Sequence, residues 1–142
     1  TPKPSSAASD VYKRQDLRVM PDEADYPAYL NWLYHSDATL TFPQTVVLRY
    51  KLQEPGVADA AVEGYSRWFV SRCKLLETAL EDKEYLCSKR FTIADICVSY
   101  AFVVAESLGI HQAFKPNIKR YTEMLFEREA FKKSKAFKFE EN

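Results

Sequence analysis

The side chains that most often carry chemistry are few in this chain of 142 residues, and they are widely spaced. Its two histidines, His35 and His111, stand alone, and a single histidine is more often a surface or hydrogen-bonded residue than a catalyst. The three cysteines, Cys73, Cys87 and Cys97, form no C-x-x-C pair, which argues against a disulfide framework or a zinc site. No Ser-His-Asp set, H-E-x-x-H motif or glycine-rich phosphate loop is recognisable. The sequence therefore predicts no catalytic residue and no metal ligand.

The clearest local signal is the start of a helix at Thr92 and Asp95. A threonine at the N-cap and a carboxylate three residues later can each accept a hydrogen bond from the other's backbone N–H. Phe91 and Ile96 flank this capping box and are expected to pack together as a hydrophobic staple. The sequence that follows is apolar almost all the way round, and Gly109 is the expected stop. We therefore predict a buried central helix over 92–108, in which Thr92 and Asp95 are structural.

Composition points to one all-α domain. The chain is 46% hydrophobic, holds only three glycines, and has no repeated β-branched alternation. Twenty basic residues balance twenty acidic ones, which favours neither nucleic acid nor an anionic membrane surface as a partner. No apolar run is long enough to cross a bilayer, and the N-terminus lacks the apolar core of a signal peptide. We therefore expect a cytoplasmic protein.

The first part of the chain differs from the rest. Residues 1–20 are predicted to be a disordered or non-native leader, because the segment is rich in Pro, Ser and Ala without a helical stripe. Within it, residues 9–15 resemble translated adapter sequence. Residues 21–142 are predicted to form the helical domain.

Hydrophobic spacing divides that domain into helices. One bent helix, or two abutting ones, is expected over 25–53, with a kink at Pro43. A single amphipathic helix is expected over 57–80, with Glu77 exposed on its flank. After the central helix, Asn117 is the expected N-cap of a fourth helix, and a short last helix is expected after residue 131.

A longer string around the capping box is more specific than the box itself. It reads Tyr85-Leu86-Cys87-Ser88-Lys89-Arg90-Phe91-Thr92-Ile93-Ala94-Asp95-Ile96. This string and the order of the helices resemble the C-terminal domain of the cytosolic glutathione S-transferase family, over about residues 21–136. The resemblance implies an all-α helical bundle. It departs at Ser88-Lys89, where the family's turn usually carries Gly-Asp.

The resemblance also implies a shared active site. In the family, an N-terminal thioredoxin-like domain binds glutathione and presents the Tyr, Ser or Cys that contacts its thiolate, while the helical domain supplies most of the pocket for a small hydrophobic electrophile. No βαβ segment precedes Pro21. The chain is therefore expected to be the C-terminal part of a transferase that is a homodimer when full length, and to be inactive alone.

Family positions that line the cleft between the domains map onto the first helix. They correspond to Tyr34, Ala38, Thr41 and Phe42 as co-substrate contacts, and to Asp37 as a residue that could meet glutathione from the neighbouring subunit. One bacterial class has a histidine where this chain has Ala38, so that class's chemistry is not expected. Tyr34 and Phe42 could instead be packing residues, and Asp37 a solvated carboxylate.

Two other functions remain open at this point. The chain could be a non-catalytic domain of the same kind used for protein–protein interaction, as in relatives associated with translation factors and synthetases. It could also be an unrelated helical interaction module. The coding sequence upstream of Asp16 would distinguish them, because the transferase requires a thioredoxin-like segment there.

Overall fold

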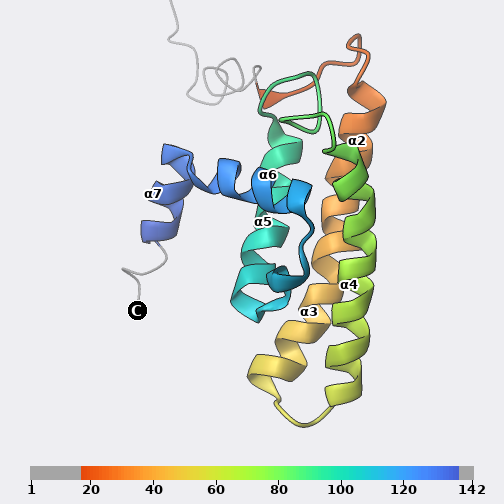
Figure 1. Ribbon diagram of the computed structural model, residues 1–142, viewed down its shortest axis with the longest axis vertical. Coiled ribbons are helices and arrows are strands. Elements are labelled where there is room, and N and C mark those ends of the chain that lie inside the picture. The colour runs from red at the N-terminus through yellow and green to blue at the C-terminus, as the bar shows by residue number, and fades with distance from the viewer. Residues whose placement is uncertain (1–16, 138–142) are drawn as a thin grey trace, which may run out of the picture.

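The computed structural model describes residues 17–137, which form a bundle of helices (Figure 1). In chain order the elements are α2 (Tyr26–Tyr34), η2 (His35–Thr41), α3 (Phe42–Leu48), η3 (Arg49–Gln53), α4 (Asp59–Ala79), α5 (Ile93–Leu108), η4 (Ile110–Ala113), α6 (Pro116–Phe126) and α7 (Glu129–Phe137). No strand longer than an isolated bridge occurs among the described residues. The predicted all-α fold is confirmed.

The first four elements form a continuous rod that changes its hydrogen bonding where a break was predicted. Pro43 has no N–H to donate to the preceding turn. The rod widens to π-helical geometry just before it, and the N–H of Phe42 donates to the carbonyl of Asp37, five residues back. The Thr41 hydroxyl donates to the carbonyl of Ser36 at 2.8 Å. The kink expected at Pro43 is thus a π-helical segment, η2, inside a rod that lies alongside α4 (Figure 1).

Helix α5 lies at the centre and packs against the rod and α6 (Figure 1). Its core-facing residues are fully buried; they include Ala94, Val98, Ala101, Phe102 and Ala105. The predicted central helix is confirmed, but it is not covered on every side, since Ile96 is 41% exposed and Tyr100 is 53% exposed. One face of the central helix is therefore left uncovered.

The capping box of α5 forms as predicted and extends further than predicted. The N–H of Thr92 donates to Asp95 Oδ2 at 2.8 Å, while Asp95 Oδ1 accepts from the N–H of Leu86 at 3.1 Å and from the Tyr121 hydroxyl at 2.6 Å. Burial and then the Asp95 charge raise the pKa of Tyr121. The helix ends at Gly109, which has a φ of 75°. The buried carboxylate thus joins the start of α5 to the preceding loop and to α6.

Phe91 packs against the hydrophobic core and contacts two further side chains. Its ring meets that of Tyr85 at 6.2 Å between centroids, and the Arg128 guanidinium lies 3.6 Å from its centroid. Ile96 is partly exposed, and its contact with Phe91 in a staple stays a prediction.

The N-terminus of α6 is capped from another helix. The N-cap position is Lys115, and Asn117 lies inside the first turn, so the prediction of Asn117 as the N-cap is wrong. The Glu77 carboxylate of α4 accepts from the N–H groups of Asn117 and Ile118, both at 3.1 Å. Glu77 is half-buried, and its predicted place on a free solvent face is also wrong. A carboxylate here complements the positive end of the α6 dipole.

The C-terminus of α4 is capped by a side chain of α6. Arg120 of α6 donates to the carbonyl of Leu80 at 2.6 Å and to that of Lys83 at 3.2 Å, just beyond α4. Each helix therefore satisfies backbone groups at an end of the other. These reciprocal caps fix how α4 and α6 cross.

The predicted leader falls mostly outside the described residues, as does the chain after residue 137. Of its last four residues, which are described, Val19 is 2% exposed and belongs to the hydrophobic core. The ordered chain thus begins before residue 21. We call residues 17–25 the strap, since they run from this anchor to the start of α2.

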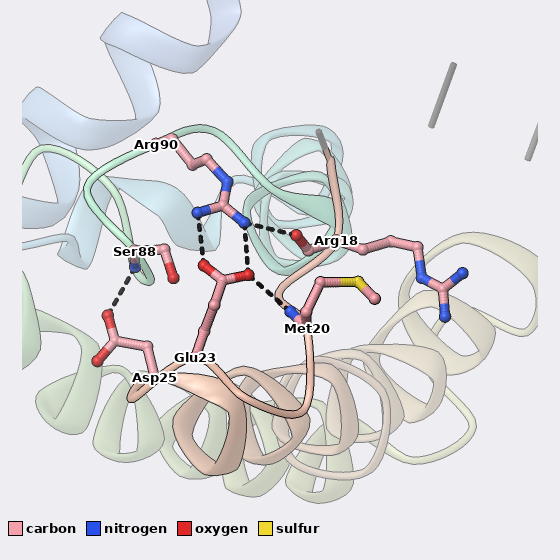
Figure 2. A network of polar contacts seen from close by, with 6 residues as sticks. All are labelled: Arg18, Met20, Glu23, Asp25, Ser88 and Arg90. Carbon is pink, nitrogen blue, oxygen red and sulfur yellow. Dashed lines mark hydrogen bonds and ion pairs between the residues drawn. The ribbon is translucent and has the colours of Figure 1, made fainter. Parts of the chain in front are cut away.

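A cluster of ion-pair and hydrogen bonds holds the strap (Figure 2). Arg90 Nη1 donates to Glu23 Oε1 at 2.7 Å and Nη2 donates to Glu23 Oε2 at 2.9 Å. Arg90 Nη2 also reaches the carbonyl of Arg18 at 2.7 Å, and the N–H of Met20 donates to Glu23 Oε2 at 2.7 Å. The hydrogen bonds from Arg90 and Met20 lower the pKa of Glu23 to about 2. We call the Glu23–Arg90 pair the clasp.

The turn before the clasp keeps its shape despite its unusual sequence. Ser88 and Lys89 both have a φ of 52°, a region that costs residues other than glycine about 1–2 kcal/mol each. The N–H of Arg90 bonds to the carbonyl of Cys87 at 3.3 Å across the turn. The N–H of Ser88 donates to Asp25 of the strap at 2.6 Å (Figure 2). Contacts with the strap therefore hold the turn on both sides.

Candidate functional site

The residues expected to contact co-substrate share an exposed face of the rod. Tyr34 is 74% exposed and Phe42 is 52% exposed, so neither is a core residue of the bundle. Asp37 and Ala38 are also exposed. Thr41 is half-buried, and its hydroxyl already donates to a backbone carbonyl. The π-helical geometry of η2 sets the positions of these side chains relative to α4 and α5.

Two of these residues lie beside a groove between η2 and α4. The groove has a volume of about 740 Å³ and is lined by His35, Ala38, Thr39, Trp68, Ser71, Arg72, Lys74, Leu75 and Thr78. Phe42 meets Trp68 edge-on at 6.4 Å between ring centroids, and the Tyr65 ring lies 5.4 Å from that of Trp68. Of the five expected residues, Ala38 lines the groove, and Phe42 contacts the lining residue Trp68. Tyr34, Asp37 and Thr41 are not among the lining residues.

Sequence reasoning missed the α4 side of this groove. Helix α4 carries a buried stripe, which includes Phe69, Cys73 and Leu76, and that stripe alone was used to predict the helix. Trp68 and Leu75 lie seven residues apart on the same helix, outside that stripe, and both are exposed. Exposed apolar residues at helical spacing beside the buried stripe were the available signal.

A second, mostly apolar groove follows the uncovered face of the central helix. It has a volume of about 350 Å³ between α5 and α7, and its lining consists of Ile96, Ser99, Tyr100, Val103, Phe131, Ser134 and Lys135. The exposed residues of α5 therefore form one wall of a continuous apolar surface.

Burial favours the uncharged forms of His35 and of the three cysteines. Burial, and then the charge of Arg72, lowers the pKa of His35. Burial raises the pKa of Cys73 to about 12 and that of Cys87 to about 11, and it also raises that of Cys97. These thiols are protonated at neutral pH and are poor nucleophiles. The arrangement is suited to binding an apolar group.

Residues 17–137 contain no cluster of three or more His, Cys, Asp or Glu side chains placed to hold a metal ion. Within the same range, no helix combines the length and the apolar character needed to cross a membrane.

Comparison with known protein families identifies one match. The family described as "Glutathione S-transferase, C-terminal domain" matches residues 51–129, which is more than half of the chain. A search of curated proteins gave no match.

Solved structures with the same fold are glutathione transferases and a related protein. The glutathione transferase URE2P8 from Phanerochaete chrysosporium, solved with oxidized glutathione, has a TM-score of 0.77 and 17% identity; the alignment covers 99% of this chain and 68% of that one. URE2P6 from the same organism, also with oxidized glutathione, has a TM-score of 0.74 and 22% identity over 87% of this chain and 58% of that one. Ure2p in complex with glutathione has a TM-score of 0.73 and 21% identity over 88% of this chain and 62% of that one.

The chain spans between 58% and 68% of the lengths of these solved proteins. At these identities the likeness concerns the fold. The family match and the described helices agree on the part of the fold that is present. The chain therefore belongs to the glutathione S-transferase family, and residues 17–137 are mostly its C-terminal helical domain.

Proposed function

We propose that this chain is the helical half of a glutathione S-transferase and supplies the co-substrate side of a shared active site. An upstream thioredoxin-like domain would bind glutathione and contact its thiolate. The thiolate would then attack an electrophilic carbon held against the helical half, where the protein's contribution is to fix the two reactants together. Tyr34, Ala38, Thr41 and Phe42 are the proposed co-substrate contacts, and Asp37 the proposed contact to glutathione.

The observation that carries this proposal is the uncovered face of α5. A central helix that exposes Ile96 and Tyr100 leaves apolar surface in water, at a cost of about 25 cal/mol per Å². A second domain packed on this face would remove that cost. It would also place its own ligand close to the rod, which packs against α5. The glutathione in the URE2P8 and Ure2p structures supports glutathione as the co-substrate.

The chain alone is expected to show no glutathione conjugation. The group that contacts the thiolate belongs to the upstream domain in this proposal, and the cysteine thiols described here are protonated. The measurement is the rate of conjugation of glutathione to an aryl halide such as chlorodinitrobenzene. A complete glutathione transferase serves as the positive control. Turnover above the buffer rate by this chain would contradict the proposed division of the active site.

The second candidate function is a non-catalytic interaction domain. The aromatic surface of α3 and α4 favours it, because Phe42, Trp68 and Leu75 are exposed together. In the transferase proposal Phe42 contacts the co-substrate, and Trp68 and Leu75 would belong to the subunit interface of a full-length homodimer. A cytoplasmic location stays a prediction under either function.

Sedimentation velocity distinguishes the two candidates. We expect this chain to be a monomer or a weak dimer at micromolar concentration, because a full-length interface would also need contacts from the upstream domain. Trp68→Ala should then leave the sedimentation coefficient unchanged. A tight dimer that Trp68→Ala dissociates would favour the interaction domain.

A further inference from the structure

The strap is attached to the bundle through one buried side chain and through polar contacts with the turn at Ser88 and Arg90. Val19 is buried in the core, and Glu23 is bound by Arg90 (Figure 2). Between them the strap makes its own turns, with the N–H of Glu23 bonded to the carbonyl of Met20 at 3.0 Å. The strap is therefore a compact unit pinned at an apolar anchor and at the clasp.

The polar attachment converges on one short turn. Apart from its junction with α2, the strap is hydrogen-bonded to the rest of the described chain through Ser88 and Arg90. Arg90 binds both Glu23 and the carbonyl of Arg18, so one guanidinium holds two points of the strap. The clasp side chains are partly exposed, at 38% for Arg90 and 29% for Glu23. Water can therefore replace these bonds when the strap lifts.

Helices α5 and α6 do not depend on the clasp for their own hydrogen bonds, and the first turn of α2 bonds to the strap through its backbone, where the N–H of Tyr29 donates to the carbonyl of Asp25 at 2.8 Å. Helix α5 is capped by Thr92 and Asp95, and α6 by Glu77, and none of these groups contacts the strap. Stability differs between parts of a protein, and segments with few buried contacts open without global unfolding. The strap, with one buried side chain and a partly exposed clasp, is such a segment.

We propose that the strap is a latch, which opens as a unit while the helices stay folded, and that the Glu23–Arg90 clasp keeps it closed. Resting on the function proposed above, the strap is also the segment through which an upstream domain joins the bundle. The clasp then sets the angle of that joint, and so the distance between the two halves of the active site.

Limited trypsin digestion tests the latch in this chain. Trypsin cuts after Arg18, whose carbonyl is bound by Arg90 and whose neighbour Val19 is buried, so cleavage there requires the strap to lift. When opening is fast, the cleavage rate follows the population of the open state. Arg90→Gln should therefore speed the appearance of the product that begins at Val19 by about tenfold, the factor that corresponds to losing one charge-assisted hydrogen bond. Glu23→Gln should act in the same direction, and Arg90→Lys should give an intermediate rate because ammonium cannot form the two-pronged contact.

The matched control breaks an ion pair elsewhere. Glu54→Gln removes the Arg49–Glu54 pair, whose N–O distance is 2.8 Å, and should leave cleavage after Arg18 unchanged. The urea midpoint of the helical circular dichroism signal should be nearly the same in all variants. Wild-type cleavage rates in both Arg90→Gln and Glu23→Gln would overturn the proposal, and so would a parallel loss of helical signal. Both readouts are independent of glutathione, so failure of the proposed function would leave the latch standing.

Discussion

Asp95→Ala is expected to lower the free energy of unfolding more than any other single change proposed for this chain. The carboxylate is fully buried and accepts from four donors, which are the N–H groups of Leu86 and Thr92 and the hydroxyls of Thr92 and Tyr121. Each buried donor left without a partner costs about 1–3 kcal/mol. Because some donors will find water, we expect a total loss of at least about 3 kcal/mol. The measurement is the urea midpoint, compared at equal slope.

Three further variants calibrate this result. Tyr121→Phe removes one hydrogen bond to Asp95 and should cost about 1–2 kcal/mol. The double variant Asp95→Ala/Tyr121→Phe should lose less stability than the sum of the two single losses, because both residues belong to one hydrogen-bond network. Glu63→Ala removes an exposed pair with Arg67 and should cost less than about 0.5 kcal/mol. If Asp95→Ala matched Glu63→Ala, the start of α5 would not depend on this carboxylate.

Glu77→Ala is expected to have the second-largest effect, at about 2 kcal/mol. The carboxylate binds two N–H groups in the first turn of α6, and hydrogen bonds to charged groups contribute about 1.5–3 kcal/mol at partly buried sites. Its charge also faces the positive end of the helix. Urea unfolding measures the loss, and hydrogen exchange at Asn117 and Ile118 locates it.

Glu77→Gln is the matched variant, since it keeps the size of the side chain and removes its charge. It should cost less than Glu77→Ala, and the difference separates the charge from the hydrogen bonds. The local sequence pattern predicted a solvent-exposed residue whose loss changes little. A cost below about 0.5 kcal/mol for Glu77→Ala would support that prediction over the capping contact.

The parts of the fold that sequence predicted are those with local causes. Thr92, Asp95 and Gly109 set the ends of α5 through groups within one turn, and these ends were found where they were expected. Pro43 was identified as a disturbance for the same reason, because its missing N–H is a property of the residue itself. A helix can accommodate such a proline by breaking or by forming a π-helical segment. Which of the two occurs depends on packing against α4 and α5, and the local sequence pattern does not contain this information.

The contacts that sequence missed join distant positions. Glu77 and Asn117 are forty residues apart, and Arg90 and Glu23 are sixty-seven apart. A helix N-terminus can be capped by its own residues or by another helix, and local sequence favours the first. Asn117 therefore read as the N-cap, although the fold supplies Glu77.

The candidate site was predicted in part because its residues came from family positions on one helix. The structure exposes Tyr34 and Phe42 as a binding face requires, but their contact with glutathione or an electrophile stays a proposal. Trp68 was not named, since the buried stripe of α4 explained that helix without it. The positions on the first helix could be named from the sequence. The opposite wall of the groove, on α4, could be identified only from how α4 packs against the rod.

The most direct test of the central claim compares this chain with a longer one. The longer protein adds the coding sequence read from the genome upstream of Asp16, and both proteins are assayed for conjugation of glutathione to the same aryl halide. The account predicts turnover by the longer protein and none by this chain, because the two halves of the active site lie on different domains. Equal rates for the two proteins, or no turnover by a longer protein that binds glutathione, would contradict it.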